Sequence, residues 1–513
     1  MNTQKAVEIL VKNLKSGKIK TKNQLEFLKR TLASEYHLDT YISNTEIIQN
    51  YDGNLKPVLK ILRIKPARML SGVSVVAVMT KPSECIHGKC IMCPGGVCEN
   101  LPKSYLLDEP ALMRAKRLDY HPYKQTNNRL RQYIIGGHTP EKVELIVMGG
   151  TFLGVEKNYQ KFFIRECFHA LNDFPEKITK SSTLEKEKKK NEKAKARCVA
   201  LVIETRPDLC YEPHINSMLD YGATRVEIGV QSTYNDVLDR IKRGHTIRDV
   251  IKSTQLLKDS GFKVTYHMMP GLPGSTAEKD IEMFRELFSN PDFCPDGLKI
   301  YPTLVIKGTE LYKMWKNKQY KALNDETAVK IISEAKKFIP EYVRIMRVQR
   351  DVPVNQIVAG PKSSNLRQLV LDRTGCRCIR CREIKADVPA DVKLLRKDYN
   401  ASMGKEIFLS AEDIKNDKII GICRLRIPYK PFRKEINDKS ALIRELHIYG
   451  KQTAIGEKGK SQHKGWGRKL LKEAEKIAKS EFNKDNIVVI SGVGVREDYR
   501  KFGYKLKGDN MCS

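Results

Sequence analysis

Three cysteines at short, irregular spacing carry the most distinctive chemistry in this chain. Cys85, Cys90 and Cys93 are separated by four and then two residues, and a Pro-Gly-Gly turn follows them. Such spacing lets the backbone curl around a metal cluster and point N–H groups at its sulfurs. The same spacing also suits a 2Fe-2S centre of the plant ferredoxin type, a zinc site or ordinary structural thiols. The loop is therefore a candidate metal centre whose context must decide its type.

The context favours a 4Fe-4S cluster. The loop follows an apolar, strand-like run at residues 72–79 and precedes a long series of βα units. Three cysteines after the first strand of a βα barrel would hold a cluster by three irons and leave the fourth open, an arrangement that resembles radical S-adenosylmethionine (SAM) enzymes. Cys98 follows five residues after Cys93. If Cys98 also bound the cluster, the open iron would be lost.

Composition indicates a large basic protein of the reducing cytoplasm. The 513 residues predict two or three domains, and 93 Lys and Arg against 61 Asp and Glu give a formal charge of +32. That excess favours a polyanionic partner such as nucleic acid, with a Lys-rich composition bias as the alternative. The 13 cysteines cluster at metal-type spacings, and neither an export signal nor an apolar run of membrane-spanning length is present.

The pattern predicts an α/β protein with several domains. Residues 1–70 form a basic helical arm in which Val7, Leu10, Val11 and Leu14 make an apolar face, and Lys56, Lys60, Arg63 and Lys65 continue the positive charge. Residues 71–340 alternate β-rich and helical runs, which predicts a partial (βα)6 barrel. Its six strands are expected at residues 73–79, 143–148, 198–204, 225–230, 263–269 and 298–301.

Polar residues and glycines stand where these strands end, at the edge where parallel-sheet enzymes bind their ligands. Gly149 and Gly150 would let the backbone approach a ligand, and Glu204 and Gln231 could bond its polar groups. His267 also lies near a strand end. Taken singly, such glycines are usually only turn residues.

Two further segments carry unusual composition. Residues 184–195 are a low-complexity charged run, which predicts a mobile insertion. Residues 341–395 are expected to be a linker containing Cys376, Cys378 and Cys381 among several arginines. These thiols fit a structural zinc site whose fourth ligand lies elsewhere, or free thiols in a basic loop.

Residues 396–513 predict an α+β domain. Strands are expected at 406–410, 419–427, 442–449 and 486–491, with a helix at 465–479. At the helix start stands Gln462-His-Lys-Gly465-Trp466-Gly467-Arg468, where glycines would expose backbone N–H groups to a pyrophosphate. Gln-x-x-Gly-x-Gly in this setting resembles the acetyl-coenzyme A loop of GNAT acetyltransferases.

With both motifs in order, nearly the whole chain resembles the catalytic subunits of Elongator and their archaeal stand-alone relatives, a radical SAM/GNAT family of tRNA uridine(34) acetyltransferases. Besides the cysteine loop and the glycine loop, seven stretches carry this resemblance. They are Ile146-Val-Met-Gly-Gly-Thr-Phe152, Ile203-Glu-Thr-Arg-Pro207, Glu227-Ile-Gly-Val-Gln231, Gly261-Phe-Lys-Val264, Gly297-Leu-Lys-Ile-Tyr-Pro-Thr303, Arg444-Glu-Leu-His-Ile-Tyr449 and Tyr499-Arg-Lys-x-Gly-Tyr504. The spacing from Cys85 to Cys90 is shorter than in eukaryotic members, and many of those lack the Cys376–Cys381 cluster.

The resemblance implies the site residues. Cys85, Cys90 and Cys93 would bind the 4Fe-4S cluster that works with SAM. Acetyl-coenzyme A would be contacted by a Lys before the second strand, here Lys142, by Tyr499, and by two stretches. These stretches are Glu445, Leu446, His447 and Ile448, and Trp466, Gly467 and Arg468. The Tyr499 hydroxyl would lie near the thioester and act in catalysis.

The resemblance also implies the reaction. A SAM-derived radical would take hydrogen from the acetyl methyl group of acetyl-coenzyme A, and the new carbon radical would add to C5 of the tRNA wobble uridine. Hydrolysis of the thioester would then leave a carboxymethyl group. Single-stranded anticodon bases can be splayed into a pocket. A protein lysine acetyltransferase and a non-catalytic tRNA-binding scaffold stay open as alternatives, and the set of tRNAs, the reductant and any homo-oligomer are not determined.

Overall fold

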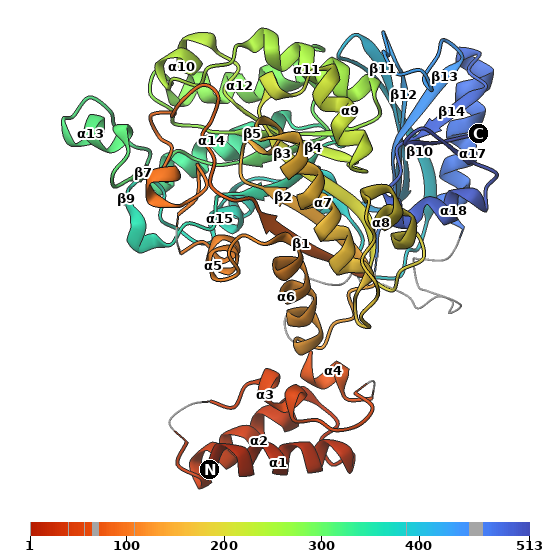
Figure 1. The fold of residues 1–513 in the computed structure, drawn as a ribbon. Helices are drawn as coiled ribbons and strands as arrows, with labels where there is room; N and C mark the ends of the chain where they lie inside the picture. The colour runs from red at the N-terminus through yellow and green to blue at the C-terminus, as the bar shows by residue number, and fades with distance from the viewer. Residues whose placement is uncertain are drawn as a thin grey trace.

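The computed structural model describes residues 2–38, 41–55, 57–63, 71–106, 108–385, 387–450 and 465–513. Figure 1 shows three parts along the chain: a group of N-terminal helices, a large α/β part and a C-terminal part built on a second sheet. Within the described residues, no helix is long and apolar enough to cross a membrane.

Four helices form the N-terminal part: α1 (Asn2–Lys15), α2 (Lys22–Glu35), α3 (Asn44–Gln49) and α4 (Leu59–Leu62). The apolar face predicted on α1 is buried and joins residues of the other three helices in a separate hydrophobic cluster. The N-terminal segment is thus a small helical unit with its own core, not an extended arm. It meets the next part where the Arg63 Nε donates to the carbonyl of Gly137 at 3.1 Å. Lys56 and Lys65 lie outside the described residues.

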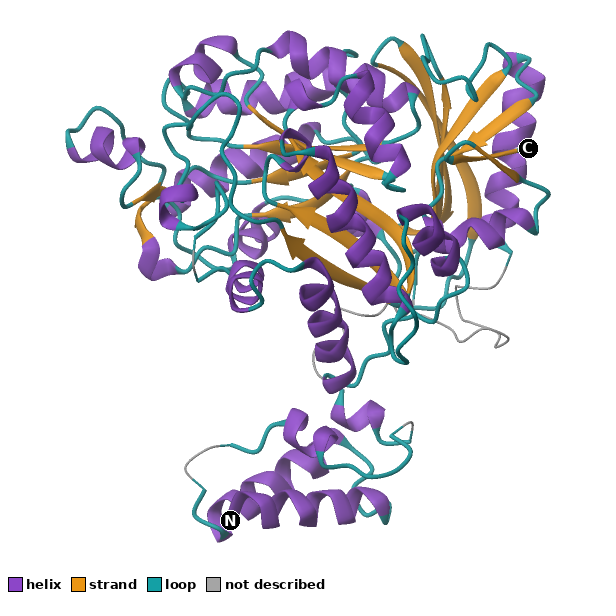
Figure 2. Ribbon diagram, viewed as in Figure 1, coloured by secondary structure: helices purple, strands orange, loops and turns teal. Residues whose placement is uncertain are grey.

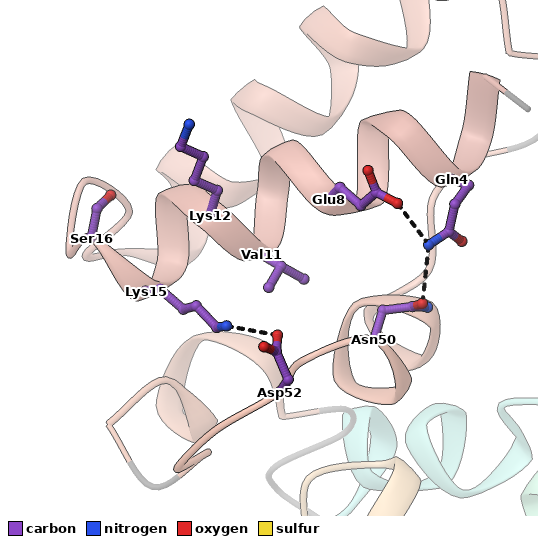
Figure 3. Close-up of a pocket in the computed structure, with 8 residues that line it drawn as sticks. All are labelled: Gln4, Glu8, Val11, Lys12, Lys15, Ser16, Asn50 and Asp52. Atoms are coloured by element: carbon purple, nitrogen blue, oxygen red, sulfur yellow. Dashed lines mark hydrogen bonds and ion pairs between the residues drawn. The ribbon is translucent and has the colours of Figure 1, made fainter.

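An open groove of about 690 Å³ runs beside α1 (Figure 3). Lys15 pairs with Asp52 at 2.6 Å, and the amide of Gln4 bonds the Glu8 carboxylate. The basic side chains in this groove are thus balanced by acidic ones, so the groove is polar without a concentrated charge.

The central part is an open, curled barrel of parallel strands (Figure 2). Seven strands pair in chain order, with helices covering the outer face: β1 (Val73–Met79), β2 (Lys142–Met148), β3 (Arg197–Thr205), β4 (Arg225–Gln231), β5 (Lys263–Met268), β6 (Gly297–Ile300) and β8 (Arg344–Val348). All six predicted strands are confirmed. The seventh, β8, lies in the segment that was predicted to be a linker.

The remaining elements of this part connect the strands or follow them. The helices are α5 (Pro110–Arg117), α6 (Pro122–Ile135), α7 (Lys157–Asn172), α8 (Leu184–Asn191), α9 (Glu212–Asp220), α10 (Asn235–Arg240), α11 (Ile247–Asp259), α12 (Ala277–Ser289), α13 (Glu310–Lys316), α14 (Asp325–Phe338), α15 (Leu366–Arg373) and α16 (Ile379–Arg382). A small antiparallel pair joins β7 (Val305–Ile306) and β9 (Ile357–Ala359).

The prediction of a mobile insertion at residues 184–195 is wrong. This segment contains α8, and its Asn191 amide donates to the Asn172 side chain at 2.8 Å and to the Ala196 carbonyl at 3.1 Å. Glu192 pairs with Arg500 of the C-terminal part at 2.7 Å. The many lysines in the sequence conceal these few buried positions.

The C-terminal part is a second seven-stranded sheet in the order β10-β11-β12-β13-β14-β16-β15. Its elements are β10 (Val392–Ala401), β11 (Gly404–Asp413), β12 (Lys418–Ile427), β13 (Ser440–Ile448), α17 (Trp466–Phe482), β14 (Asn486–Val489), α18 (Arg496–Arg500), β15 (Lys505–Lys507) and β16 (Asn510–Cys512). Among these pairs only β13 and β14 run parallel, and their pairing ends at Ile443 and Val489. Because β14 ends at Val489 while β13 continues to Ile448, the last residues of β13 have no partner in β14.

The C-terminal sheet docks on the amino ends of the barrel strands. The Arg444 guanidinium donates to the carbonyl of Phe262, just before β5, at 2.8 Å. A Cβ at Gly492 would come within 2.1 Å of the Val199 carbonyl oxygen in β3, so only glycine permits this contact. The loop after β14 is therefore packed backbone to backbone against the start of β3.

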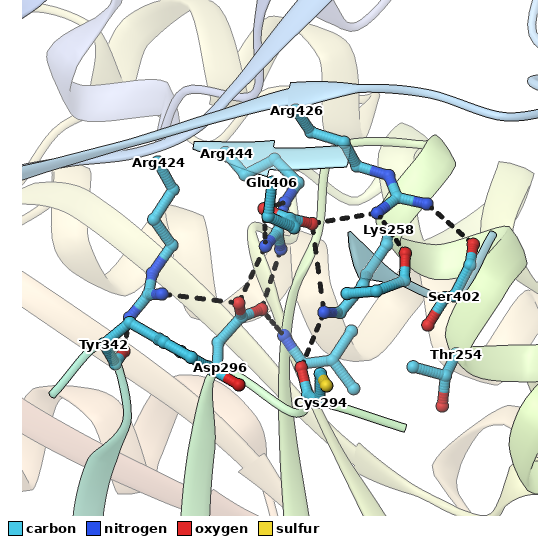
Figure 4. A network of polar contacts seen from close by, with 12 residues as sticks. Thr254, Lys258, Cys294, Asp296, Tyr342, Ser402, Glu406, Arg424, Arg426 and Arg444 are labelled. Carbon is cyan, nitrogen blue, oxygen red and sulfur yellow. Dashed lines mark hydrogen bonds and ion pairs between the residues drawn. The ribbon is translucent and has the colours of Figure 1, made fainter. Parts of the chain in front are cut away.

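A buried network of charges lies within this interface (Figure 4). Asp296, in the loop before β6, pairs with Arg444 at 2.7 Å, and Glu406 pairs with both Arg444 and Arg426. Lys258 donates to the Cys294 carbonyl at 2.6 Å. Buried ions are costly unless paired, so this network requires both parts to be in place.

Candidate functional site

A cavity of about 170 Å³ lies at the carboxyl ends of the barrel strands. Loops that follow several strands of the barrel contribute to it, as expected for an open parallel sheet. The cysteine loop, the ends of β3, β4, β5 and β6, and β8 all supply lining residues: Cys85, Cys90, Cys93, Gly150, Glu204, Glu227, Gln231, Arg243, His267, Lys299, Tyr301 and Arg347. The cavity thus brings together most of the residues predicted from the cysteine loop and the strand ends.

The three cysteines of the loop all line this cavity. Cys90 and Cys93 are buried, Cys85 is half-buried, and all three thiols are free. Gly95 has φ +72°, and a Cβ there would press against the Pro102 and Tyr105 carbonyls, so the turn needs glycine. The donor set of three free thiols facing one cavity fits a 4Fe-4S cluster held by three irons.

Cys98 does not share this placement. Its side chain is exposed, and the residue is absent from the cavity lining. The Sγ atoms of Cys85, Cys90 and Cys93, all three of which are described, do not all lie within 4.8 Å of one another. Wide spacing is expected of thiols that each bind a different iron, and it disfavours a single zinc ion.

The predicted strand-end residues have different roles. A Cβ at Gly149 would lie 2.0 Å from Thr80 Oγ1, so this glycine permits packing of β2 against the end of β1. A Cβ at Gly150 would make only an ordinary contact, 3.9 Å from the Lys103 carbonyl oxygen, and Gly150 lines the cavity. Glu204 accepts a hydrogen bond from the Tyr105 hydroxyl at 2.7 Å and pairs with Lys299 at 3.2 Å.

Gln231 leaves a polar atom without a partner. Its backbone has φ +74°, and its Oε1 is buried with no hydrogen-bond donor among the described residues. A buried amide oxygen that lines a cavity is costly unless a ligand donates to it. This orphaned acceptor supports ligand binding beside the cysteine loop.

A row of charged side chains lies inside the barrel, and of its members near the cavity sequence reasoning singled out only Glu204 and His267. Glu227 pairs with Lys299 and lies 3.0 Å from His267 Nε2. Although burial opposes its charged form, the neighbouring Glu227 raises the pKa of Lys299 above its ordinary value. Glu204, Glu227 and His267 are close enough to hold one metal ion, but the Lys299 ammonium pairs with both carboxylates and supplies the positive charge there.

This row continues toward the C-terminal sheet. Arg225 pairs with Glu144 at 2.5 Å and with Glu227 at 3.3 Å, and Lys263 at the start of β5 pairs with Glu445 of β13 at 3.3 Å. The interior of a βα barrel is usually filled by apolar layers. Arg225 and Glu227, two charged residues at alternate positions of β4, are the sequence signal that could have revealed this row.

The stretch Glu445 to Ile448 presents its side chains in two directions. Glu445 also bonds the Arg424 Nε at 2.8 Å, so its carboxylate is engaged at the domain interface. Burial lowers the pKa of His447 to about 4. Ile448 instead lies against Gly421 and Gly467, on the side of α17. A ligand would therefore contact these four residues mainly through their backbone, along the edge of β13 that has no pairing with β14.

Helix α17 begins directly beside this edge. Gly465 caps the helix with φ +76°, and Trp466 and Gly467 follow, with Arg468 exposed. The predicted Gln462 and His463 lie outside the described residues. Among the described residues, a Cβ at Gly467 would meet only Ile448, at 3.6 Å, which is an ordinary contact.

Tyr499 and Lys142 lie in different surroundings. Tyr499 is buried on α18, its ring 5.8 Å from that of Tyr504, and burial raises the pKa of its hydroxyl above the usual range. Lys142 is the first residue of β2 and pairs in register with Arg197 of β3. Gly494 of the C-terminal part packs so closely on Arg197 that a Cβ there would lie 2.6 Å from the Arg197 Cβ. Lys142 thus stands at the barrel edge that the C-terminal sheet covers.

The second cysteine group is compact. Cys376, Cys378 and Cys381 have their sulfurs within 4.8 Å of one another, beside the Arg367 guanidinium at 3.7 Å from Cys381 Sγ. Burial lowers the pKa of the neighbouring Lys336, whose Nζ has no hydrogen-bond acceptor among the described residues. No fourth metal-binding residue joins this group in the described ranges.

Comparison with known proteins places the chain in a family. Three family models match: the ELP3 N-terminal domain at residues 3–70, the Radical SAM superfamily at 87–287 and the Radical_SAM C-terminal domain at 295–374. The last of these includes β8. The central part is thus a radical SAM domain.

Relatives cover almost the whole chain. A tRNA uridine(34) acetyltransferase of Methanocaldococcus infernus is 52% identical over 98% of each chain, and Elongator complex protein 3 of Drosophila melanogaster is 42% identical over 98% of this chain and 95% of that protein. The structure of archaeal Methanocaldococcus infernus Elp3 with an N-terminal deletion matches with a TM-score of 0.76 at 50% identity, covering 86% of this chain and 99% of that one. The chain therefore belongs to the family of tRNA uridine(34) acetyltransferases and Elongator complex protein 3.

Proposed function

We propose that this protein is a tRNA uridine(34) acetyltransferase that modifies C5 of the wobble uridine toward carboxymethyluridine. The observation that carries the proposal is the cavity at the barrel's carboxyl edge, where three free thiols meet the orphaned Gln231 acceptor. A radical SAM domain of this family supplies the cofactor chemistry that an unactivated C–H bond requires.

Within this cavity, Cys85, Cys90 and Cys93 would hold the 4Fe-4S cluster. Gly150 and Gln231 stand beside it as candidate contacts for SAM, because one gives open backbone and the other an unused acceptor. Glu204 would act through its bonds to Tyr105 and Lys299. When bound and reduced, the cluster would supply the electron that cleaves SAM to a 5'-deoxyadenosyl radical.

The C-terminal part is proposed to be a GNAT domain that binds acetyl-coenzyme A. Its strands β13 and β14 leave the backbone of Glu445 to Ile448 free of strand pairing with β14, and α17 points its first N–H groups to the same place. That arrangement suits a pantetheine arm and a pyrophosphate. Trp466, Gly467, Arg468, Lys142 and Tyr499 remain the proposed contacts, and Tyr499 the proposed catalytic hydroxyl.

The proposed macromolecular partner is the anticodon region of tRNA. The formal charge of +32 favours a polyanion, and the N-terminal helices add a compact basic unit to the barrel. The chemistry also requires a reductant. Cys376, Cys378 and Cys381 are proposed to bind a structural zinc ion, since their compact sulfur group fits a single metal.

Anaerobic reconstitution tests the proposal. Iron, sulfide and a reductant would be supplied with SAM, acetyl-coenzyme A and tRNA, and the nucleosides would be analysed by mass spectrometry. We expect a carboxymethyl-type uridine that needs every component. Acetyl transfer to peptides without SAM or reductant would favour a protein acetyltransferase instead, and tRNA binding without turnover of either cofactor would favour a scaffold.

A further inference from the structure

The sulfur of Cys90 lies on the positively charged side of the cavity. The Arg243 Nη1 is 3.6 Å from Cys90 Sγ, and Arg206 stands behind it with its Nη1 donating to the Arg243 carbonyl at 2.9 Å. Cys93 has a different neighbour, because its sulfur lies 3.4 Å from the neutral Ser104 hydroxyl. The two buried thiols of the loop thus have unlike electrostatic surroundings.

Arg243 is held in place without a counter-ion. Its Nη2 donates to the Gly229 carbonyl at 2.7 Å, and its buried Nε has no acceptor among the described residues. Arg206, in contrast, forms a two-pronged pair with Asp208 at 2.9 Å. In the described part of the chain, no carboxylate lies within ion-pair distance of Arg243. Its charge is therefore available to a negative group at Cys90.

His87 does not compete for this role. Its Nε2 lies 3.2 Å from Cys90 Sγ and 3.1 Å from the Arg206 Nη1. Because a guanidinium N–H can only donate, His87 Nε2 accepts the hydrogen bond from Arg206. A neutral ring that accepts at Nε2 carries its proton on Nδ1 and gives the Cys90 thiolate no N–H.

We propose that Arg243 is a positioning residue that raises the reduction potential of the cluster through its charge and N–H contact at Cys90. This inference rests on the proposed cluster at Cys85, Cys90 and Cys93. Reduction adds one negative charge to the cluster, and a nearby cation or hydrogen bond to a ligand sulfur stabilises the reduced form. A guanidinium with no carboxylate partner exerts this effect undiminished by a neighbouring anion.

The test compares variants by the midpoint potential of the reconstituted cluster. Arg243→Gln removes the charge and Arg243→Lys keeps it, and both would be titrated anaerobically with the reduced cluster followed by electron paramagnetic resonance. We expect a shift to more negative potential in Arg243→Gln and a value near the original in Arg243→Lys. Arg347→Gln is the matched control, because Arg347 lines the same cavity but is neutralised by Asp351 at 3.0 Å.

A second variant guards against loss of the cluster in Arg243→Gln. A Cβ at Gly229 would lie 2.4 Å from the Arg243 Nη2, so Gly229→Ala displaces the guanidinium while keeping its charge. We expect a negative shift here as well, smaller than that of Arg243→Gln. Iron content separates the two proposals, because absence of a cluster in the unaltered protein would overturn the proposed function itself.

Three outcomes would overturn the role of Arg243 while leaving the cluster intact. Equal potentials in the unaltered protein and in Arg243→Gln would show that its charge does not reach the cluster. An unchanged cluster potential in Arg243→Gln without SAM, combined with weaker SAM binding, would show that Arg243 instead binds the carboxylate of SAM. An equal shift in Arg347→Gln would show a general charge effect of the cavity.

Discussion

Single thiols decide whether the cavity can hold its cluster. Replacing Cys90 by Ala removes one of the three proposed ligands and leaves Arg243 facing an empty position, so we expect iron content and cluster absorbance to fall to background. Binding of tRNA should persist, because the charges proposed to contact phosphates lie elsewhere. The measurement is iron and sulfide per chain after anaerobic reconstitution.

Cys98→Ser is the matched control, since this thiol is exposed and lies off the cavity. It should reconstitute like the unaltered protein. A cluster that forms normally without Cys90, or one that is lost without Cys98, would contradict the assignment of Cys85, Cys90 and Cys93 as the three ligands.

At the scale of residues, the candidate ligands were easier to predict than their surroundings. Cys85, Cys90 and Cys93 are close in sequence, so their spacing marked them as candidate metal ligands, and all three line one cavity. Lys299 and Arg243 reach the same cavity from distant segments, and a lone Lys or Arg near a strand end has no sequence signature. Their roles follow only from the buried partners that folding gives them, such as Glu227 and Gly229.

The loop after β5 contacts a carboxylate that responds to pH. Burial raises the pKa of Asp280 from 3.8 to about 6, although the Gly271 N–H and the Ser275 hydroxyl, each at 2.6 Å, partly oppose this. A raised pKa means that the folded state binds the proton more tightly than the unfolded state. The stability contributed by protonated Asp280 is thus full below pH 4 and is lost as pH rises through about 6.

Asp280→Asn should therefore stabilise the protein at pH 8 by up to about 3 kcal/mol, at about 1.4 kcal/mol per pKa unit, and change it little at pH 4. Its amide oxygen can still accept from Gly271. Urea unfolding at the two pH values is the measurement, with the exposed Glu278→Gln on the same helix as control. Lower stability of Asp280→Asn at pH 8 would show that the carboxylate's hydrogen bonds outweigh its burial.

The start of α17 is proposed to receive the pyrophosphate of acetyl-coenzyme A. Because a Cβ at Gly467 makes only an ordinary contact with Ile448, Gly467→Val should fold yet fill the space above the helix end. We expect acetyl-coenzyme A binding to weaken at least about tenfold, or about 1.4 kcal/mol, by isothermal titration calorimetry. SAM cleavage should persist without modification of RNA.

Lys472→Ala is the control for this helix, since its side chain is exposed farther along α17. Its affinity for acetyl-coenzyme A should stay unchanged. Normal modification of tRNA by Gly467→Val would place the acetyl donor outside the C-terminal part and would end the two-domain proposal.

Among the elements, those with clear periodicity were predicted and those without it were not. The six barrel strands alternate with helices and are apolar enough to be seen. β10 is a largely exposed edge strand with charged residues at several positions, so no apolar alternation marks it. α8 was read as mobile because lysines dominate it, whereas its structure depends on Asn191 and Glu192, whose contacts lie outside the helix.

At the scale of the whole molecule, the two sheets share one hydrophobic core. The cavity lies at the carboxyl ends of the barrel strands and the C-terminal sheet at their amino ends, with the charged row from Glu445 to Glu204 between them. Sequence reasoning identified both parts but could not show this opposition. It depends on contacts such as Gly492 on Val199, between residues far apart in the chain.

Asp296 tests whether the buried network joins the two parts energetically. It pairs with Arg444 through both carboxylate oxygens at 2.7 Å, lies 3.6 Å from the Arg424 guanidinium and accepts from the Val264 N–H at 2.8 Å. Although burial disfavours its charge, these arginines and Lys258 hold the pKa of Asp296 well below its ordinary value. Its contribution to stability is therefore present at neutral pH and is lost only in strong acid.

Asp296→Asn should leave two buried guanidiniums without their shared carboxylate and destabilise the protein by about 3–5 kcal/mol. Differential scanning calorimetry at pH 7 is the measurement, and we expect one cooperative transition in the unaltered protein that moves to lower temperature or divides in two in the variant. Glu176→Gln is the control, because its pair with Lys195 is exposed and should contribute little. An unchanged transition in Asp296→Asn would mean that backbone packing alone joins the sheets, and that the charges of Figure 4 are not needed to hold the C-terminal sheet against the barrel.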